Sequence, residues 1–513
     1  MLKIEKYTYG EVMRRTLEAY GDDYVVYIDE KGSMKLGDLM GHTDSLAACL
    51  IRDHGIKQGG RVTVIGNNTI DWFISFYAII RAGCVAVIVN PRLSIEEIKR
   101  HCEASESELI LLTGAGVDYD DELTAAFGDK VIIPDRVPPH LVTEEELQML
   151  DDIEKDFPPR GDAIAFFTSG STSKPKVALL PQEALVYNTC RFTERNYPHG
   201  EYIPTTLPVY HVMGQQQNLL YMMAGITMVL GDNKIDSIVE TCRKYPVREM
   251  GNVSTIFIML MRHPDFDSVV KPNLDYIIIG GGSASPEQIG ELEERYDAIV
   301  AKGYGLTEAG CTVTINAFDA PREKRYYTSG NALDGVDLKI GNLSEKEGSS
   351  PFCPTGEVGE VLVGGDSLMN GYAEDAGEEV TIDERGYLHT GDLAYLDEDG
   401  YLYICGRKKS IIVKGGENIL PSEVESCISA MDCVDAVIVL GVPDEKYGEE
   451  VGAFVVPKKG FTVTLEDIQA AVCEKLTRFK QPGYLYLYDR FPLNDTGKPD
   501  LVKLKADASE KRV

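Results

Sequence analysis

Short apolar runs alternate with amphipathic segments over the first two-thirds of the chain, and this alternation constrains the fold more than any other feature. Residues 61–66, 84–89 and 108–112 are apolar runs of strand length, and helical patterns at 70–81 and 95–103 separate them. Strands that alternate with helices form parallel sheets covered on both faces. The predicted fold class is therefore α/β, with a large N-terminal domain of doubly wound sheets.

The pattern changes in the last third of the chain. Glycine-rich segments at 356–365 and 395–406 are read as β-hairpins, the second with an Asp-Gly turn at 399–400. Helical and strand patterns then alternate again, which indicates a smaller α+β domain. We predict an N-terminal domain at 1–406 and a C-terminal domain at 407–513.

Composition excludes several classes of function. The chain has 82 acidic and 51 basic residues, a formal net charge of −31, with no separate basic stretch, so nucleic acid and anionic membranes would be repelled. The most hydrophobic stretch, 73–89, contains Arg81 and Gly83 and is read as a helix followed by a strand, not as a membrane span. Eleven irregularly spaced cysteines without C-x-x-C, and a start without an apolar signal core, predict a cytoplasmic location.

A polar loop after the predicted strand 162–167 is the first candidate for a binding site. It offers hydroxyl groups, backbone N–H groups and two lysines at Thr168, Ser169, Gly170, Ser171, Thr172, Lys174 and Lys176. Such groups can surround phosphate oxygens and supply positive charge. The spacing differs from the P-loop, and the same composition also suits an ordinary surface loop.

Further motifs follow this loop along the chain. They are PVYH at 208–211, GGGSASP at 280–286, GYGLTE at 303–308, YLHTGDL at 387–393, GRKK at 406–409, KGGEN at 414–418 and PLNDTGK at 492–498. In this order the motifs resemble the signatures of the AMP-forming adenylating superfamily, and acyl-CoA synthetases most closely. The resemblance covers essentially the whole chain. It implies a small β-barrel within the N-terminal domain and a mobile C-terminal domain.

Within the N-terminal domain the resemblance implies residues for the acid, the nucleotide and a metal. His211 would lie beside the acyl pocket. A glycine turn and an aromatic ring would hold the adenine, and these residues are Gly281, Gly282, Ser283, Tyr304 and Gly305. Thr307 would meet the α-phosphate and Glu308 would bind Mg²⁺. An aromatic face suits a base, and carboxylate oxygen suits a hard cation.

Toward the C-terminus the resemblance implies ribose, CoA and catalytic residues. Asp392 would accept hydrogen bonds from the ribose hydroxyls, and Arg407 would also reach the ribose. Lys409 would be the hinge between the domains. Lys414, Gly415 and Gly416 belong to the segment that lines the CoA tunnel, and Lys498 is the catalytic lysine. The cosubstrates and cofactor implied are ATP, CoA and Mg²⁺.

The predicted function is an ATP-dependent acid–CoA ligase for a fatty or aryl carboxylic acid. An acyl-AMP ligase that loads a separate carrier protein remains an alternative. A catalytically weak nucleotide- or acyl-binding protein is a second alternative, because Ser173 and Val177 replace glycines usual in the phosphate loop. Other departures are Lys302, His389 and Leu501, and none removes a reacting group. The oligomeric state stays open.

Overall fold

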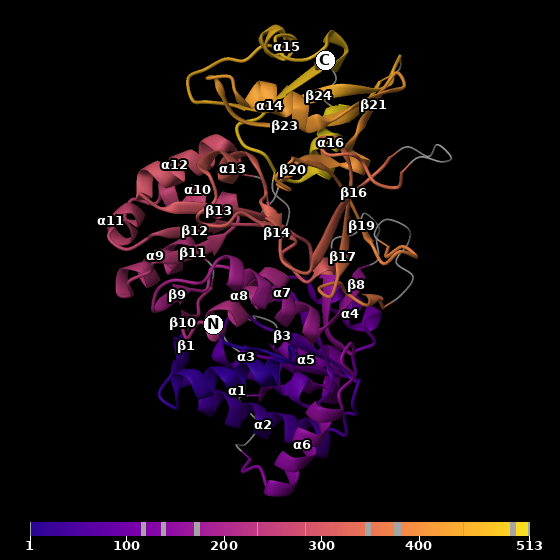
Figure 1. Cartoon of the computed structure of the whole chain (residues 1–513). Helices are drawn as coiled ribbons and strands as arrows, with labels where there is room; N and C mark the ends of the chain where they lie inside the picture. The colour runs from indigo at the N-terminus through magenta and orange to yellow at the C-terminus, as the bar shows by residue number, and fades with distance from the viewer. Residues whose placement is uncertain are drawn as a thin grey trace. The chain divides into compact units, whose positions relative to one another are not determined.

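The computed structural model describes residues 2–113, 120–134, 140–168, 175–232, 234–282, 284–343, 350–373, 381–444, 446–492 and 499–510 (Figure 1). Contacts between residues divide the chain into two compact units. The N-terminal unit comprises Met1–Leu338, Val363–His389 and Gly400–Leu402. The C-terminal unit comprises Lys339–Leu362, Thr390–Asp399 and Tyr403–Val513. The predicted domain boundary at residue 407 stays a prediction.

The N-terminal unit contains a seven-stranded sheet in the order β18-β8-β7-β4-β3-β5-β6. Its strands are β3 Arg61–Ile65, β4 Val85–Val89, β5 Leu109–Leu112, β6 Val131–Ile132, β7 Asp162–Thr168, β8 Lys176–Pro181 and β18 Gly371–Tyr372. Strands β3 to β7 pair in parallel, which confirms the α/β pattern read from the sequence. Strands β8 and β18 extend this sheet in antiparallel fashion.

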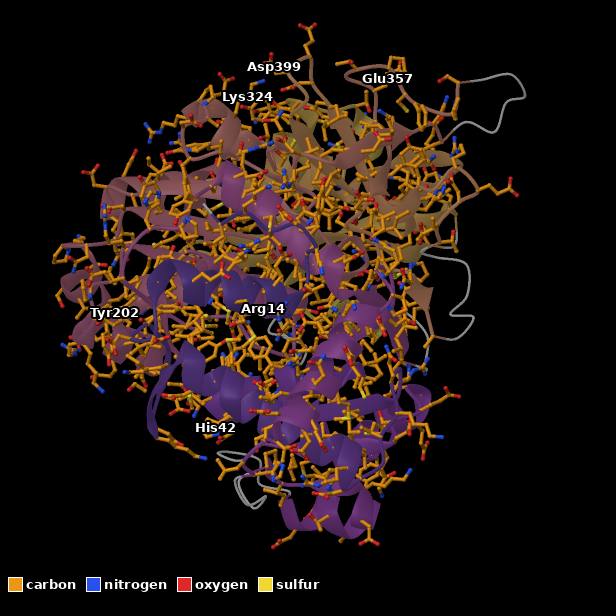
Figure 2. The ribbon with its side chains drawn as sticks, turned by 60° about the horizontal axis from the view of Figure 1, so that its bottom comes forward. Arg14, His42, Tyr202, Lys324, Glu357 and Asp399 are labelled. Carbon is orange, nitrogen blue, oxygen red and sulfur yellow. The ribbon has the colours of Figure 1, made fainter. Side chains whose placement is uncertain are left out.

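Amphipathic helices pack on this sheet and on one another. They are α1 Tyr9–Tyr20, α2 Leu36–Arg52, α3 Ile70–Arg81, α4 Ile95–Ala104, α5 Asp120–Phe127 and α6 Glu144–Asp156. Helices α2, α3 and α6 lie side by side (Figure 1). Arg14 on α1, labelled in Figure 2, forms a bidentate ion pair with Glu154 on α6 at 2.6 and 3.0 Å. The helix predicted at 70–81 is confirmed with both its bounds.

Two further sheets complete the N-terminal unit. One has the order β2-β1-β10-β9, with β1 Val25–Asp29, β2 Gly32–Lys35, β9 Tyr202–Pro204 and β10 Thr227–Val229. The other has the order β11-β12-β13-β14-β15, with β11 Glu249–Asn252, β12 Tyr276–Ile279, β13 Ile299–Tyr304, β14 Thr314–Ile315 and β15 Asn331–Ala332. The helices of this part are α7 Gln182–Arg195, α8 Val212–Met223, α9 Ile235–Lys244, α10 Ser254–Arg262, α11 Phe266–Val270, α12 Pro286–Tyr296 and α13 Arg322–Tyr327.

The β-rich part read from the sequence forms a four-stranded sheet in the order β16-β17-β19-β20. The strands are β16 Val336–Gly341, β17 Gly359–Gly365, β19 Leu388–Leu396 and β20 Leu402–Arg407. The hairpin predicted at 395–406 is confirmed by β19 and β20. The hairpin predicted at 356–365 is wrong, because that segment contains one strand, β17, whose partners β16 and β19 come from distant parts of the sequence.

The rest of the C-terminal unit is built on a second sheet. Strands β21 Ile412–Lys414, β22 Glu417–Ile419, β23 Val434–Asp444, β24 Gly448–Pro457 and β25 Tyr484–Leu487 make it up. Strand β24 pairs with β21, β23 and β25. The helices are α14 Pro421–Ser429, α15 Leu465–Cys473 and α16 Leu501–Glu510. Among the described residues, no helix combines the length and apolar character that crossing a membrane would require.

Candidate active site

The described ends of the phosphate loop lie next to each other. Thr168 ends β7, Lys176 begins β8, and the two residues are register partners across this antiparallel pair. Lys176 is only 7% exposed, so its ammonium group needs a polar or charged neighbour. The other predicted residues of this loop, Ser169, Gly170, Ser171, Thr172 and Lys174, lie outside the described residues.

Tyr372 connects this loop to the predicted metal ligand. Glu308 lies on a short 3₁₀ turn after β13 and is 8% exposed. The Tyr372 hydroxyl donates a hydrogen bond to Glu308 Oε1 at 2.7 Å, and the nearby Thr168 side chain acts to lower the pKa of Tyr372. The ring centre of Tyr372 lies 5.6 Å from Lys176 Nζ. Burial and the nearby Glu308 carboxylate raise the pKa of Tyr372.

The structure therefore brings together three predicted residues around one that was not predicted. Thr168 and Lys176 come from the two ends of one loop, Glu308 comes from a distant part of the chain, and they meet at Tyr372. The only sequence signal at Tyr372 is a Gly-Tyr pair at 371–372, which is too common to indicate a site. Only pairing of β18 with β8 places this ring beside the loop.

The turn that carries Tyr304 requires a close approach between two backbone segments. A Cβ atom on Gly305 would lie 1.7 Å from the carbonyl oxygen of Cys311, so this position admits only glycine in the observed backbone. The backbone N–H of Val313 donates to the Tyr304 carbonyl at 2.9 Å. Tyr304 and Thr307 are both partly exposed.

The predicted adenine turn lies directly before a well-capped helix. Gly281 and Gly282 are exposed and follow β12, whereas Ser283 lies outside the described residues. Ser285 and Gln288 form a reciprocal capping box with Pro286 at the first helical position, and each is a residue type that favours its place in such a cap.

Helix α8 brings the predicted acid-binding residue to the same turn. His211 is its exposed N-cap residue. The Met213 side chain lies 2.9 Å from the positions that Cβ atoms would take on Gly280 and Gly281. The acyl-pocket prediction and the adenine prediction therefore converge on one part of the N-terminal unit.

The two predicted ribose residues meet within the C-terminal unit. Arg407 Nε donates to Asp392 Oδ1 at 2.8 Å, and the Asp392 side chain is 10% exposed while that of Arg407 is 57% exposed. The pair offers a fixed carboxylate beside a guanidinium group that solvent can reach. Lys409, the predicted hinge, is exposed on a 3₁₀ turn that follows directly.

The predicted CoA segment is a tight hairpin turn. Lys414 ends β21, Glu417 begins β22, and the two are register partners. Gly415 and Gly416 between them have φ angles of +59° and +90°, a left-handed conformation that favours glycine. The predicted catalytic residue Lys498 lies outside the described residues.

Glu308 also suits the predicted role at a metal. In the part of the chain that the structure describes, no three His, Cys, Asp or Glu side chains gather into a metal-binding cluster. Mg²⁺ is typically held by one or two carboxylates together with substrate phosphates and water. A single buried carboxylate, oriented by Tyr372 beside the phosphate loop, fits that requirement.

Family models match both parts of the chain. The model for AMP-binding enzymes matches residues 13–373, and the model for the C-terminal domain of AMP-binding enzymes matches residues 423–498. The chain belongs to the AMP-binding enzyme family. It is an enzyme of the AMP-forming acid–thiol ligase class, as the sequence predicts.

Curated relatives agree with this assignment, and a solved structure has a similar fold. The chain is 30% identical to an oxalate–CoA ligase of Arabidopsis thaliana, with 96% of each chain covered. It is 27% identical to a long-chain-fatty-acid–CoA ligase of Escherichia coli O6:H1, with 94% of this chain and 93% of the relative covered. In fold it is similar to ATP-bound MatB from Rhodopseudomonas palustris, with a TM-score of 0.82, 23% identity, and 97% and 99% of the two chains covered.

Proposed function

We propose that this enzyme activates a fatty or aryl carboxylic acid with ATP and transfers the acyl group to CoA. The observation that carries the proposal is the cluster of Thr168, Lys176 and Glu308 around Tyr372. This cluster combines a hydroxyl, an ammonium and a carboxylate group at the end of a loop whose composition suits phosphate. The relatives act on acids as different as oxalate and a long-chain fatty acid, which supports acid–CoA ligation in general.

The first step joins the acid to AMP. A carboxylate oxygen of the acid attacks the α-phosphorus of ATP, the bond to the β-phosphate breaks, and pyrophosphate leaves. Lys498 would bridge the carboxylate and the α-phosphate, and Thr168 and Lys176 would hold the departing phosphates. Mg²⁺, held by Glu308, would supply further positive charge against the phosphate oxygens.

The second step uses the acyl-adenylate. The C-terminal domain would turn about Lys409, which withdraws Lys498 and brings Gly415 and Gly416 to the thiol path. The sulfur of CoA then attacks the acyl carbon, the bond from this carbon to the AMP oxygen breaks, and AMP leaves. Adenylation makes this exchange feasible because AMP is a far better leaving group than oxide.

The experiment that tests this proposal measures the two steps separately. ATP–pyrophosphate exchange is measured over a panel of fatty, aryl and dicarboxylic acids, followed by acyl transfer to CoA or to a carrier protein. Lys498→Ala should lower exchange by about 100-fold or more but should spare transfer from a supplied acyl-adenylate. Lys503→Ala, which changes an exposed lysine on α16, should leave both steps intact.

Three outcomes contradict parts of this proposal. Exchange with no acid in the panel would favour a protein that only binds nucleotide. Transfer to a carrier protein but not to CoA would identify an acyl-AMP ligase. Equal loss of both steps in Lys498→Ala would refute the role assigned to Lys498.

A further inference from the structure

A buried ion pair holds the side chain at the start of the glycine turn. Lys414 Nζ lies 2.5 Å from Glu450 Oε1 on β24, and the two side chains are only 13% and 9% exposed. Lys414 Nζ also lies 3.5 Å from the backbone carbonyl oxygen of Gln481. Glu450 Oε1 accepts a second hydrogen bond from the Val451 backbone N–H at 2.8 Å. Both charged groups are therefore fixed at their polar ends.

The lack of a side chain at Gly483 leaves room for the side chain of Glu450. A Cβ atom on Gly483 would lie 2.5 Å from Glu450 Cγ. The Gly483 backbone N–H donates to the Val451 carbonyl at 2.9 Å, which holds this segment against β24. Loss of either charge would leave the other one buried without a partner, and such a change is strongly unfavourable.

The backbone on both sides of Lys414 is held by the same region. The Val413 N–H donates to Glu449 Oε2 at 2.8 Å, and the Gly415 N–H donates to the Tyr447 carbonyl at 2.9 Å. The centre of the Tyr447 ring lies 5.5 Å from Lys414 Nζ. Three consecutive residues, 413 to 415, are thus each bound to the segment 447–450, and the left-handed turn at Gly415 begins from a fixed position.

We propose that Glu450 is a positioning residue for acyl transfer, which acts through Lys414 to hold the turn at Gly415 and Gly416 in the shape that admits the pantetheine arm of CoA. This inference rests on the proposed function. Lys414 lies in a predicted CoA segment, yet its ammonium group is buried and already contacts Glu450 and the Gln481 carbonyl, so it is poorly placed to bind a phosphate of CoA. Its contribution to CoA use is therefore indirect.

The test compares single and paired substitutions in the transfer step. Glu450→Gln and Lys414→Met should each lower kcat/KM for transfer from a supplied acyl-adenylate by about 10- to 100-fold, because small misplacements of a site have effects of this size. Pyrophosphate exchange should stay within about twofold of the wild type, because adenylation does not use this turn.

Pantetheine, which lacks the nucleotide phosphates, separates positioning from direct binding. If Glu450 acts by positioning, the kcat/KM for transfer should fall by the same factor with pantetheine as with CoA in each single variant. Lys446→Met is the matched control, because Lys446 Nζ lies 4.6 Å from the centre of the same Tyr447 ring but its side chain is exposed. This control should transfer normally.

Several results would overturn the inference. Lys414 would be a direct phosphate ligand if Lys414→Met lost kcat/KM for transfer to CoA but not to pantetheine, while Glu450→Gln transferred normally to both. If a single variant unfolds, the double variant Lys414→Met with Glu450→Leu is measured instead, because it buries no charge. Normal transfer by that double variant contradicts the proposal. A wild type that exchanges pyrophosphate but forms no thioester would instead refute the proposed function.

Discussion

Glu249 illustrates how a single residue takes a role that its type does not suggest. Its side chain is fully buried at the start of β11. It accepts hydrogen bonds from the Tyr221 hydroxyl at 2.8 Å and from the His199 backbone N–H at 3.1 Å. Burial raises the pKa of Glu249 to about 8. Tyr221 belongs to α8, so this carboxyl group joins the helix capped by His211 to the neighbouring sheet.

A pH dependence of stability follows from the raised pKa of Glu249. An unfolded glutamate has a pKa of about 4.3, so between about pH 4.3 and 8 only the folded state holds this proton. Over this range the contribution of Glu249 to the free energy of unfolding falls by about 1.4 kcal/mol for each unit by which the pH rises. Glu249→Gln should remove this slope. Urea unfolding at several pH values measures it, with the exposed Glu240→Gln as control. Parallel curves for the wild type and Glu249→Gln would show that the carboxyl group is ionised in the folded state.

At the scale of single elements, helix-capping residues and hydrophobic periodicity are good indicators of where helices begin and end. Helix α12 starts with Ser285 as its cap and Pro286 at its first position, residue types favoured there, and α3 has the bounds predicted for it. Capping and hydrophobic periodicity involve residues within a few positions of one another, so they can be read from the chain directly. The hairpin predicted at 356–365 was wrong for the opposite reason, because the strand in this segment pairs with β16 and β19 and not within the segment.

The cap of α12 should affect both stability and nucleotide binding. Ser285→Ala removes the hydrogen bond from Gln288 N–H to the Ser285 hydroxyl and should cost about 1 kcal/mol. It should also raise the KM for ATP in pyrophosphate exchange, because the predicted adenine turn at Gly281 and Gly282 precedes this cap. Thr143→Ala removes the same type of capping box on α6 and should lower thermal stability alone. An unchanged KM in Ser285→Ala would separate this helix from nucleotide binding.

At the scale of the whole molecule, the predicted site residues are divided between two compact units. The phosphate, adenine and metal predictions lie in the N-terminal unit, and the ribose and CoA predictions lie in the C-terminal unit. A two-step reaction uses such a division when one unit moves between steps. The net charge of −31 belongs to this scale too, because it describes the whole chain, whereas the lysines of the motifs would provide positive charge locally.

Restricting the predicted pivot should affect the second step. Lys409→Pro fixes the φ angle at residue 409 and should lower acyl transfer to CoA by about tenfold or more, while pyrophosphate exchange is retained. Lys409→Ala removes the same side chain but leaves the backbone free, and it should transfer at close to the wild-type rate. Both steps are measured as above. Normal transfer by Lys409→Pro would place the pivot at another residue.

The sequence by itself determined the α/β class, the limits of several helices and strands, and the family, since these depend on periodicity, capping and motifs that are local in the chain. It also pointed to Thr168, Lys176 and Glu308, but it could not show that they meet. Only the tertiary structure placed Tyr372 against Glu308 and Glu450 against Lys414. Such pairs depend on which distant strands become neighbours, and burial then decides the strength of each contact.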